Sequence, residues 1–265
     1  MNKPLALLIA FLLSISYVSA QQKPGTLSIT PKLGATLSGF NNNMPAQVRY
    51  VIYPILDSQT GLPVMDINNP PLIVGVELYD NSDKMGLTIG VEGQYQMTSA
   101  LGLSFGAFYT QEGARYTPKQ KTSTSNLYQL TLHDDINTYY HCITVPILAQ
   151  LYVWKGLSLK AGLQPDFAVY RRNKNHVTID YLGESYDIHS KVDANIRGIA
   201  LSAPVGICYE YKKLVADLRY CFGLTNLRKD GIYFEDHSGI ARGHAITLTL
   251  GYKIQFNKQF VSRIH

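Results

Sequence analysis

Strict alternation of apolar and polar residues runs along most of the chain after residue 26. In residues 87–97 one face is apolar and uncharged while the other holds Thr, Gly, Glu and Gln, and residues 244–256 repeat this arrangement. A period of two residues is typical of β-strands, because successive side chains point to opposite faces. Counted in this way, the chain has eight predicted strands, at residues 27–38, 87–97, 101–112, 143–153, 157–168, 199–211, 214–225 and 244–256.

The predicted strands and their connections have the proportions of a transmembrane barrel. Most of the strands reach the roughly 9 to 11 residues that a tilted strand needs to cross a bilayer. Short links at 98–100, 154–156 and 212–213 alternate with long polar links at 41–84, 113–140, 170–196 and 226–242. Short turns on one side and long loops on the other predict an all-β, up-and-down antiparallel transmembrane β-barrel, with both termini on the short-link, periplasmic side.

The alternation does not say which face points outward, because a soluble lipocalin-like barrel has the same period with an apolar interior. The polar face is rich in Gly, Ser, Thr and Gln, which suits a narrow, filled interior. Aromatic residues also collect near the strand ends, where their rings favour membrane interfaces. These residues are Tyr95, Tyr109, Tyr152, Trp154, Tyr170, Tyr209, Tyr211 and Tyr252. We therefore expect the apolar face to contact lipid.

Composition and the N-terminus agree with an exported membrane protein. Hydrophobic residues make up 46% of the 265-residue chain, but charged residues only 16%, against about a quarter in soluble domains. Residues 1–20 resemble a secretory signal peptide, with Lys3 before an apolar run and Val18-Ser19-Ala20 as cleavage pattern. Residues 21–265 then form a single domain, with the barrel strands within 26–256. The net charge of +5 is too small to predict a nucleic-acid partner.

An eight-stranded barrel is only wide enough for side chains to fill it. The inward set must therefore pack and pair with itself. By the alternation, this interior polar network includes four cations and three anions: Lys32, Glu92, Lys160, Glu210, Asp217, Arg219 and Lys253. We expect a nearly balanced ion network and no open water channel.

The first long link is itself partly strand-like, in residues 47–56 and 71–79, so that ten strands are possible. Pro45, Pro54, Pro70 and Pro71 disfavour central ladder positions, and we expect instead strands extended above the membrane. The apolar residues of link 41–84 make it a possible contact for a protein partner. Packing against the barrel's own rim is the alternative.

No group of residues predicts catalysis or cofactor binding. His133-Asp134-Asp135 could form an acid-base set, but neighbouring residues of an extended chain point to opposite faces. His176, His189, His237 and His244 lie in different links without metal-ligand spacing. Neither a catalytic residue, a cofactor site nor a metal site is therefore expected. The three cysteines, Cys142, Cys208 and Cys221, are expected to be packed small residues.

Two short segments point to partners in the envelope. Arg171, Arg172 and Lys174 follow a predicted strand exit and could contact the phosphates of lipopolysaccharide. Gly251, Ile254 and Phe256 resemble the C-terminal signal that the barrel assembly machinery recognises during insertion, although nine residues follow them.

Four segments in order resemble the PorT-like outer-membrane β-barrel family of Bacteroidetes. They are Tyr109-Thr110-Gln111-Glu112-Gly113-Ala114, Ile143-Thr144-Val145-Pro146-Ile147-Leu148, Leu159-Lys160-Ala161-Gly162 and Arg219-Tyr220-Cys221-Phe222-Gly223-Leu224-Thr225-Asn226. Thr144 stands where that family usually has Glu. The resemblance covers most of residues 26–256 and implies an outer-membrane barrel without catalytic residues. The family's namesake is linked to type IX secretion, a role that the long first link makes doubtful here.

The sequence thus predicts a non-enzymatic outer-membrane barrel that presents long loops for surface interaction or for an envelope or secretion assembly. A small porin or transporter is the first alternative, and a lipid-modifying outer-membrane enzyme is the second. Both alternatives use the same barrel. They differ in whether the lumen is open and whether a catalytic group exists.

Overall fold

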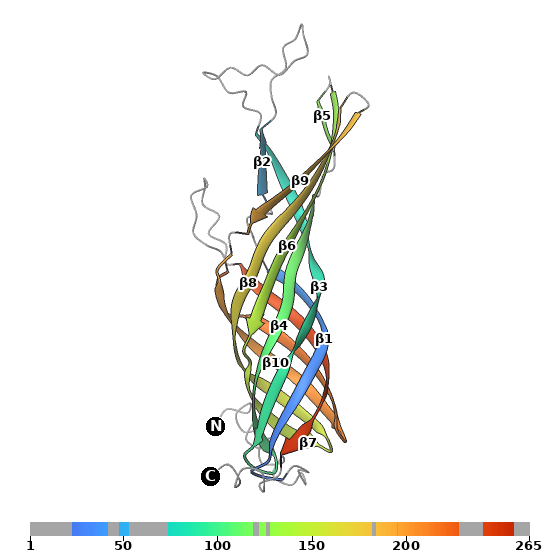
Figure 1. The fold of residues 1–265 in the computed structure, drawn as a ribbon. Coiled ribbons are helices and arrows are strands. Elements are labelled where there is room, and N and C mark those ends of the chain that lie inside the picture. Colours follow the sequence, from blue (N-terminus) through green and yellow to red (C-terminus); the bar gives the residue numbers. More distant parts are fainter. Residues whose placement is uncertain are drawn as a thin grey trace.

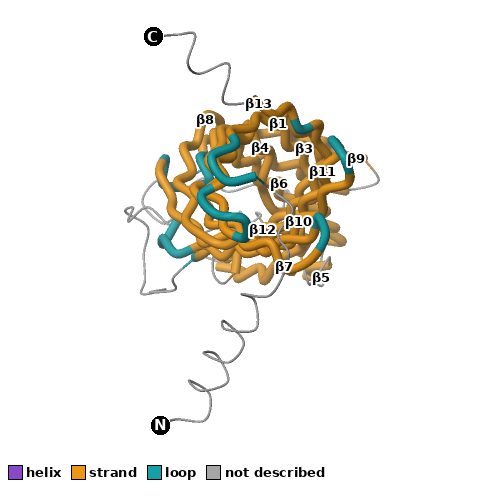
Figure 2. Tube along the Cα trace, turned by 90° about the horizontal axis from the view of Figure 1, so that it is seen from below, coloured by secondary structure: helices purple, strands orange, loops and turns teal. Residues whose placement is uncertain are grey.

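The structure is a tall, closed β-barrel (Figures 1 and 2). This computed structural model describes residues 23–41, 48–52, 74–118, 122–125, 128–181, 184–194, 196–227 and 241–256. The strands are β1 (Leu27–Asn41), β2 (Val48–Ile52), β3 (Val74–Gln96), β4 (Leu101–Pro118), β5 (Thr122–Ser125), β6 (Tyr128–Thr144), β7 (Ile147–Trp154), β8 (Leu157–Tyr181), β9 (Glu184–Asp193), β10 (Ile199–Tyr211), β11 (Leu214–Gly223), β12 (Arg242–Tyr252) and β13 (Ile254–Phe256). No helix among these residues is long and apolar enough to cross a membrane.

The ring has eight strand positions among the described residues, in the order β3, β1, β12, β11, β10, β8, β7 and β4, and it closes where β3 pairs with β4. Every pairing between neighbours is antiparallel. The predicted up-and-down antiparallel barrel is therefore confirmed, with each of the eight alternating segments in the ring. Closure leaves no unpaired strand edge, as a structure that crosses hydrocarbon requires.

One ring position is shared by two strands. β6 and β7 follow each other along the same path and are separated by Val145 and Pro146. Hydrogen bonds continue across the break, because Val145 N–H donates to Pro165 O at 2.9 Å and Gly106 N–H donates to Pro146 O at 3.0 Å. The proline removes one donor, but the chain stays in the wall of the barrel.

Side chains alternate as the sequence predicts in the lower part of the barrel, at the end with the short turns. Along β1, Ser28, Thr30 and Lys32 are buried while Leu27 and Ile29 are exposed. The same holds around the ring, where the exposed residues form what we call the apolar belt. Its upper edge runs through Leu37, Met85, Ile143 and Val169. A belt of outward apolar side chains around a polar interior is the pattern of a membrane barrel.

Four strands continue far above the belt. β3 has 23 residues, β4 has 18, β6 has 17 and β8 has 25, and Figure 1 shows them rising as one sheet above the closed ring. The predicted boundaries were therefore too short at these upper ends. The predicted strands ended where the alternation lost its apolar face. Pairing between strands continues beyond that point, because backbone hydrogen bonds do not require apolar side chains.

The first long link adds no strand to the ring. Its described part, β2, pairs with the start of β3 between Val48↔Leu78 and Ile52↔Val74, above the barrel. Residues 42–47 and 53–73 lie outside the described residues. Residues 177–189 of the third long link fall in the hairpin formed by β8 and β9, which pair from Tyr181↔Glu184 onward. Both described chain ends lie at the short-turn end, where Leu27 pairs with Phe256 and Tyr95.

Candidate functional site

Five charged side chains meet inside the barrel, and we call them the ion cluster: Lys32, Glu92, Lys160, Asp217 and Arg219. All five are buried. Lys32 Nζ donates to Glu92 Oε1 and to Asp217 Oδ2, both at 2.8 Å. Lys160 Nζ donates to the same two oxygens at 2.6 and 2.8 Å. Arg219 donates through Nε to Asp217 at 2.7 Å and through Nη2 to Glu92 at 3.0 Å.

The ion cluster spans the lumen. Lys160 on β8 bonds Glu92 on β3, and these strands are separated by β4 and β7 on one side of the ring and by four strands on the other. The Arg219 guanidinium on β11 lies 5.4 Å from the ring centroid of Phe108 on β4, the strand diametrically opposite. Side chains from facing walls therefore meet at this level.

A second layer crosses the lumen nearer the short-turn end. Lys253 Nζ donates to Glu210 Oε2 at 2.7 Å and to Gln94 Oε1 at 2.9 Å. Tyr152 Oη donates to Glu210 Oε1 at 2.6 Å and accepts from Gln94 Nε2 at 2.7 Å. The structure thus places all seven charged residues of the expected interior network inside. It divides them into three cations with two carboxylates in the ion cluster and one pair, Lys253 and Glu210, below it.

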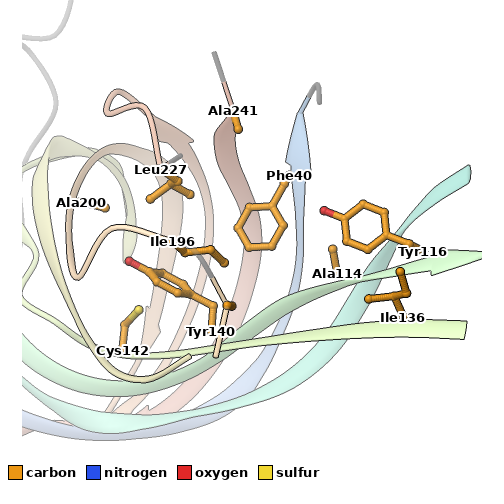
Figure 3. Packing of buried hydrophobic residues seen from close by; sticks show 11 residues of the cluster. Phe40, Ala114, Tyr116, Ile136, Tyr140, Cys142, Ile196, Ala200, Leu227 and Ala241 are labelled. Carbon is orange, nitrogen blue, oxygen red and sulfur yellow. The ribbon is translucent and has the colours of Figure 1, made fainter. Parts of the chain in front are cut away.

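A third layer, which the sequence analysis did not anticipate, is apolar and fills the upper end of the barrel. Figure 3 shows Phe40 in the middle of the view, with Tyr116 on one side and Ile196 and Tyr140 on the other. The ring centroids of Phe40 and Tyr140 are 6.4 Å apart in an edge-on arrangement. We call this layer the cap cluster; its members are Phe40, Ala114, Tyr116, Ile136, Tyr140, Cys142, Ala194, Ile196, Ala200, Leu227 and Ala241.

The cap cluster reflects an inversion of polarity at the upper edge of the apolar belt. Above that edge the inward residues of β6 include Ile136 and Tyr140, while the outward ones are Asn137, Tyr139 and His141. Below it, inward residues are polar and outward residues apolar. The alternation keeps its period of two residues through β6, and only the polar and apolar character of the two faces is exchanged. Assigning every second residue of β6 to the same face would therefore reveal this inversion from the sequence.

A small cavity of about 30 Å³ lies against the cap cluster, with Glu112, Tyr140 and Asp166 in its lining. Asp166 accepts hydrogen bonds from Gln164 Nε2 at 2.8 Å and from Ser202 Oγ at 2.9 Å. Among the described residues, no group of three or more His, Cys, Asp or Glu side chains could hold a metal ion.

The three basic residues expected at the strand exit do not share one surface. A β-bulge on β8 pairs His141 with Tyr170 and Cys142 with Ala168, so that Val169 is an extra residue. The bulge shifts the alternation by one position, as an inserted residue does. Arg171 consequently turns inward, where Nη1 donates to Ile196 O, whereas Arg172 and Lys174 point outward.

Arg172 and Lys174 belong to an outward group just above the apolar belt that we call the rim patch: Lys84, Tyr109, Tyr139, His141, Tyr170, Arg172 and Lys174. Two ammonium groups approach the Tyr139 ring, with Lys84 Nζ at 2.9 Å and Lys174 Nζ at 4.6 Å from its centroid. The sequence analysis named Tyr109 and Tyr170 only as interface aromatics and missed Lys84, Tyr139 and His141. These residues come together only through the register of four strands, which the fold defines.

The electrostatics of the rim patch are unbalanced. Burial, and to a smaller extent the charge of Lys174, together lower the pKa of Lys84 to about 8. Lys84 Nζ has no hydrogen-bond acceptor among the described residues. Desolvation and these two cations also lower the pKa of His141, whose Nδ1 lies 2.8 Å from Tyr109 Oη. Two cations are thus held close together, and no described carboxylate lies between them.

The other predicted residues take the following places. Cys142, Cys208 and Cys221 are buried and free. In the C-terminal segment, Gly251 lies beside Lys32 on the neighbouring strand, and Ile254 is exposed on the outer face.

The possible acid-base set and the histidines lie mostly above the barrel. The register pairs His133 with Thr178, and Asp135 with His176. His176 in turn pairs with His189 on β9. The side chains of residues 131–135 lie outside what the structure describes, as does His237. His244 Nε2 lies 3.0 Å from Asp83 Oδ1.

Comparison with known proteins gives a family and several similar structures. Residues 19–229 match the family described as outer membrane protein beta-barrel domain. Ail, the attachment invasion locus protein of Yersinia pestis, is similar at 12% identity and TM-score 0.37, covering 88% of this chain and 100% of that chain. The outer membrane protease OmpT from Escherichia coli is similar at 10% identity and TM-score 0.36, covering 90% and 100%. Neisserial surface protein A is similar at 12% identity and TM-score 0.31, covering 86% and 97%. A search of curated protein sequences gave no match.

Proposed function

We propose that this chain, which belongs to the outer membrane protein beta-barrel domain family, is a non-enzymatic, non-conducting barrel that holds a surface of long strands outside the cell. Its place is the outer membrane. The short-turn end with both chain termini faces the periplasm in this proposal, and the extended strands β3, β4, β6 and β8 face outward.

The observation that carries the proposal is the filling of the lumen at three levels. The layer around Lys253, the ion cluster and the cap cluster each join side chains from facing walls. Charge pairs in such a dry interior hold each other in place, because separating them would leave buried charges without partners. A barrel filled in this way anchors a surface and does not carry solutes.

The test is conductance in a planar bilayer. Purified full-length protein should give no current steps above those of the protein-free bilayer, while a porin inserted under the same conditions should. Heat-modifiable migration on a gel would show that the inserted sample was folded. Stable, reproducible channels from folded protein would contradict the proposal and favour the porin or transporter alternative.

The extended strands support a role in contacts outside the membrane. Link 41–84 and the hairpin formed by β8 and β9 emerge from this end, and we propose that they meet a partner of the envelope or of a secretion assembly. The four motifs that resemble the PorT-like family lie on β4, β6, β7, β8 and β11 and support membership in that branch. We further propose that Gly251, Ile254 and Phe256 serve recognition by the barrel assembly machinery.

No observation favours the second alternative, a lipid-modifying enzyme. His133, Asp134 and Asp135 are consecutive on β6, so that neighbouring side chains of this strand alternate between its two faces. Three consecutive residues of an extended strand do not converge on one reacting atom. The proposed function is therefore non-enzymatic.

A further inference from the structure

The rim patch lies at the height where lipid headgroups begin. Lys84 directly precedes Met85, whose side chain is 75% exposed, and Tyr170 directly follows Val169, which is 58% exposed. Both apolar residues belong to the upper edge of the belt. The patch therefore starts where the acyl chains would end, and Tyr109, Tyr139 and Tyr170 have the amphipathic rings typical of that interface.

The patch is built across four neighbouring strands, β3, β4, β6 and β8. Gly113 on β4 pairs with Tyr139 on β6, and a Cβ at Gly113 would lie 3.3 Å from Lys84 Cδ. Because glycine has no side chain, the Lys84 stem crosses β4 and brings its ammonium group onto the Tyr139 ring. Lys174 approaches the same ring from β8. Three strands thus hold two ammonium groups over one aromatic ring.

Among the side chains that the structure describes, none neutralises the ammonium groups of Lys84 and Lys174. Lys84 Nζ lacks an acceptor among the described residues. Arg172 has one carboxylate in reach, Asp193, at 3.7 Å, but these side chains are 48% and 90% exposed, and such exposed pairs are weak. An anion that carries more than one negative charge would relieve the repulsion between Lys84 and Lys174. It would also accept hydrogen bonds from the exposed donors of the patch.

We propose that the rim patch binds a phosphate group of a glycolipid in the outer leaflet. Phosphate supplies several strong acceptor oxygens and up to two negative charges. It matches the exposed Lys174 ammonium group and the planar Arg172 guanidinium as direct contacts, while Lys84 Nζ, which is covered beside the Tyr139 ring, adds its positive charge from below. A lipid source fits because the acyl chains of the same molecule would cover the apolar belt directly below. The choice of leaflet rests on the orientation of the proposed function.

The test uses full-length protein in detergent micelles, titrated with bisphosphoryl lipid A and with its dephosphorylated form, and native mass spectrometry to measure the bound fraction. Wild-type protein should bind the phosphorylated lipid more tightly by about tenfold or more, since one hydrogen bond to a charged group is worth roughly that factor. The double variant Lys84→Gln/Lys174→Gln should lose this preference. Unchanged preference in the folded double variant would overturn the proposal.

A matched control exists at the opposite end of the barrel. Lys212 and Lys213 also lie over aromatic rings, 5.5 Å from Tyr211 and 5.7 Å from Tyr252. The variant Lys212→Gln/Lys213→Gln removes the same charge and should keep the preference for the phosphorylated lipid. An equal loss in this control would show that only the net charge matters, and would also overturn the proposal.

Two further measurements distinguish a glycolipid site from a site for free phosphate and cover the case in which the Lys84 variant does not fold. Inorganic phosphate should not compete at millimolar concentration; if it bound as tightly as the lipid, the site would be one for free phosphate and the glycolipid assignment would be wrong. If the Lys84 variant does not fold, Arg172→Gln/Lys174→Gln changes exposed residues only and should weaken binding in the same direction. The assay is independent of conductance and of orientation in the cell, so its failure leaves the proposed function standing.

Discussion

Two lysines cross a glycine on a neighbouring strand, one inside the barrel and one outside. Lys32 pairs with Gly251, where a Cβ would lie 2.7 Å from Lys32 Cγ. Lys84 passes Gly113 in the same manner on the outer face. In each case the missing side chain lets a long cation reach a partner beyond the next strand. Such close approach is a common reason for glycine within a strand.

The first residue-scale prediction concerns the charge balance of the ion cluster, which has three cations and two carboxylates. Glu92→Gln leaves three cations with one carboxylate and should lower the free energy of unfolding by about 3–5 kcal/mol, as for other broken buried pairs. Lys32→Met leaves two of each and should cost clearly less. Urea unfolding in micelles measures both. A larger loss for Lys32→Met would show that hydrogen bonding outweighs charge balance.

The second residue-scale prediction concerns pH. Because the pKa of Lys84 is lowered to about 8, the free site loses a positive charge as the pH rises through 8, and binding of bisphosphoryl lipid A should weaken between pH 7 and pH 9. The groups that face Lys84 are Tyr139 and His141 on β6 and Lys174 on β8. The phosphate remains doubly charged throughout, since its second pKa is about 6.

The matched variant for this prediction is Lys84→Arg. An arginine side chain stays protonated in this range, so the variant should bind lipid A with a flatter pH profile than wild type. Mass spectrometry of the bound fraction at both pH values gives the comparison. Identical profiles for the two proteins would mean that the charge of Lys84 does not act on the phosphate.

At the scale of elements, the long strands separate into two parts. β1 and β3 pair within the barrel from Leu27↔Tyr95 to Ser38↔Lys84. Above Lys84, β3 pairs instead with β2 and with the upper part of β4. A register shift in the pairing of β3 with β4, between Asp83 and Thr88, marks the transition. The barrel and the upper sheet are thus joined mainly through strands that continue from one into the other.

The element-scale prediction follows from this division. Deleting residues 45–79 removes β2 and the first residues of β3 but leaves every pairing of β1 with β3 in place. The truncated protein should therefore fold, and should keep the heat-modifiable migration of the full chain. Loss of this migration would show that the upper sheet is needed to close the ring. Any partner that depends on link 41–84 should be lost on the same deletion.

At the scale of the whole molecule, the protein is a membrane barrel below and a water-exposed β-structure above. The lower part turns apolar residues to lipid and fills its interior with paired charges. The upper part turns Asn137 and Arg115 outward and buries the cap cluster. The hydrophobic effect explains both arrangements, because apolar surface faces whichever neighbour is not water. The change of solvent along one continuous strand therefore fixes the height of the membrane.

Much of this architecture could be predicted from the sequence alone. Period-two alternation is local, so it identified the eight ring segments and divided each of them into an apolar and a polar face without knowledge of the fold. The composition of the polar face and the aromatic residues near the strand ends then assigned the apolar face to the outside and the seven charges to the inside. Short turns at 98–100, 154–156 and 212–213 likewise follow from residues close in sequence. Local patterns of this kind need no knowledge of which strands face each other.

The tertiary structure alone decided which residues meet. The pairing of Lys160 with Glu92 depends on ring closure, since their strands are far apart in sequence. The bulge at Val169 turned Arg171 inward and Arg172 outward, which alternation without a register cannot reveal. The cap cluster and the rim patch likewise need several strands at one height. The alternation in the sequence shows which residues share a face of each strand. The closure of the barrel and the register of its strands determine which residues of other strands these side chains contact.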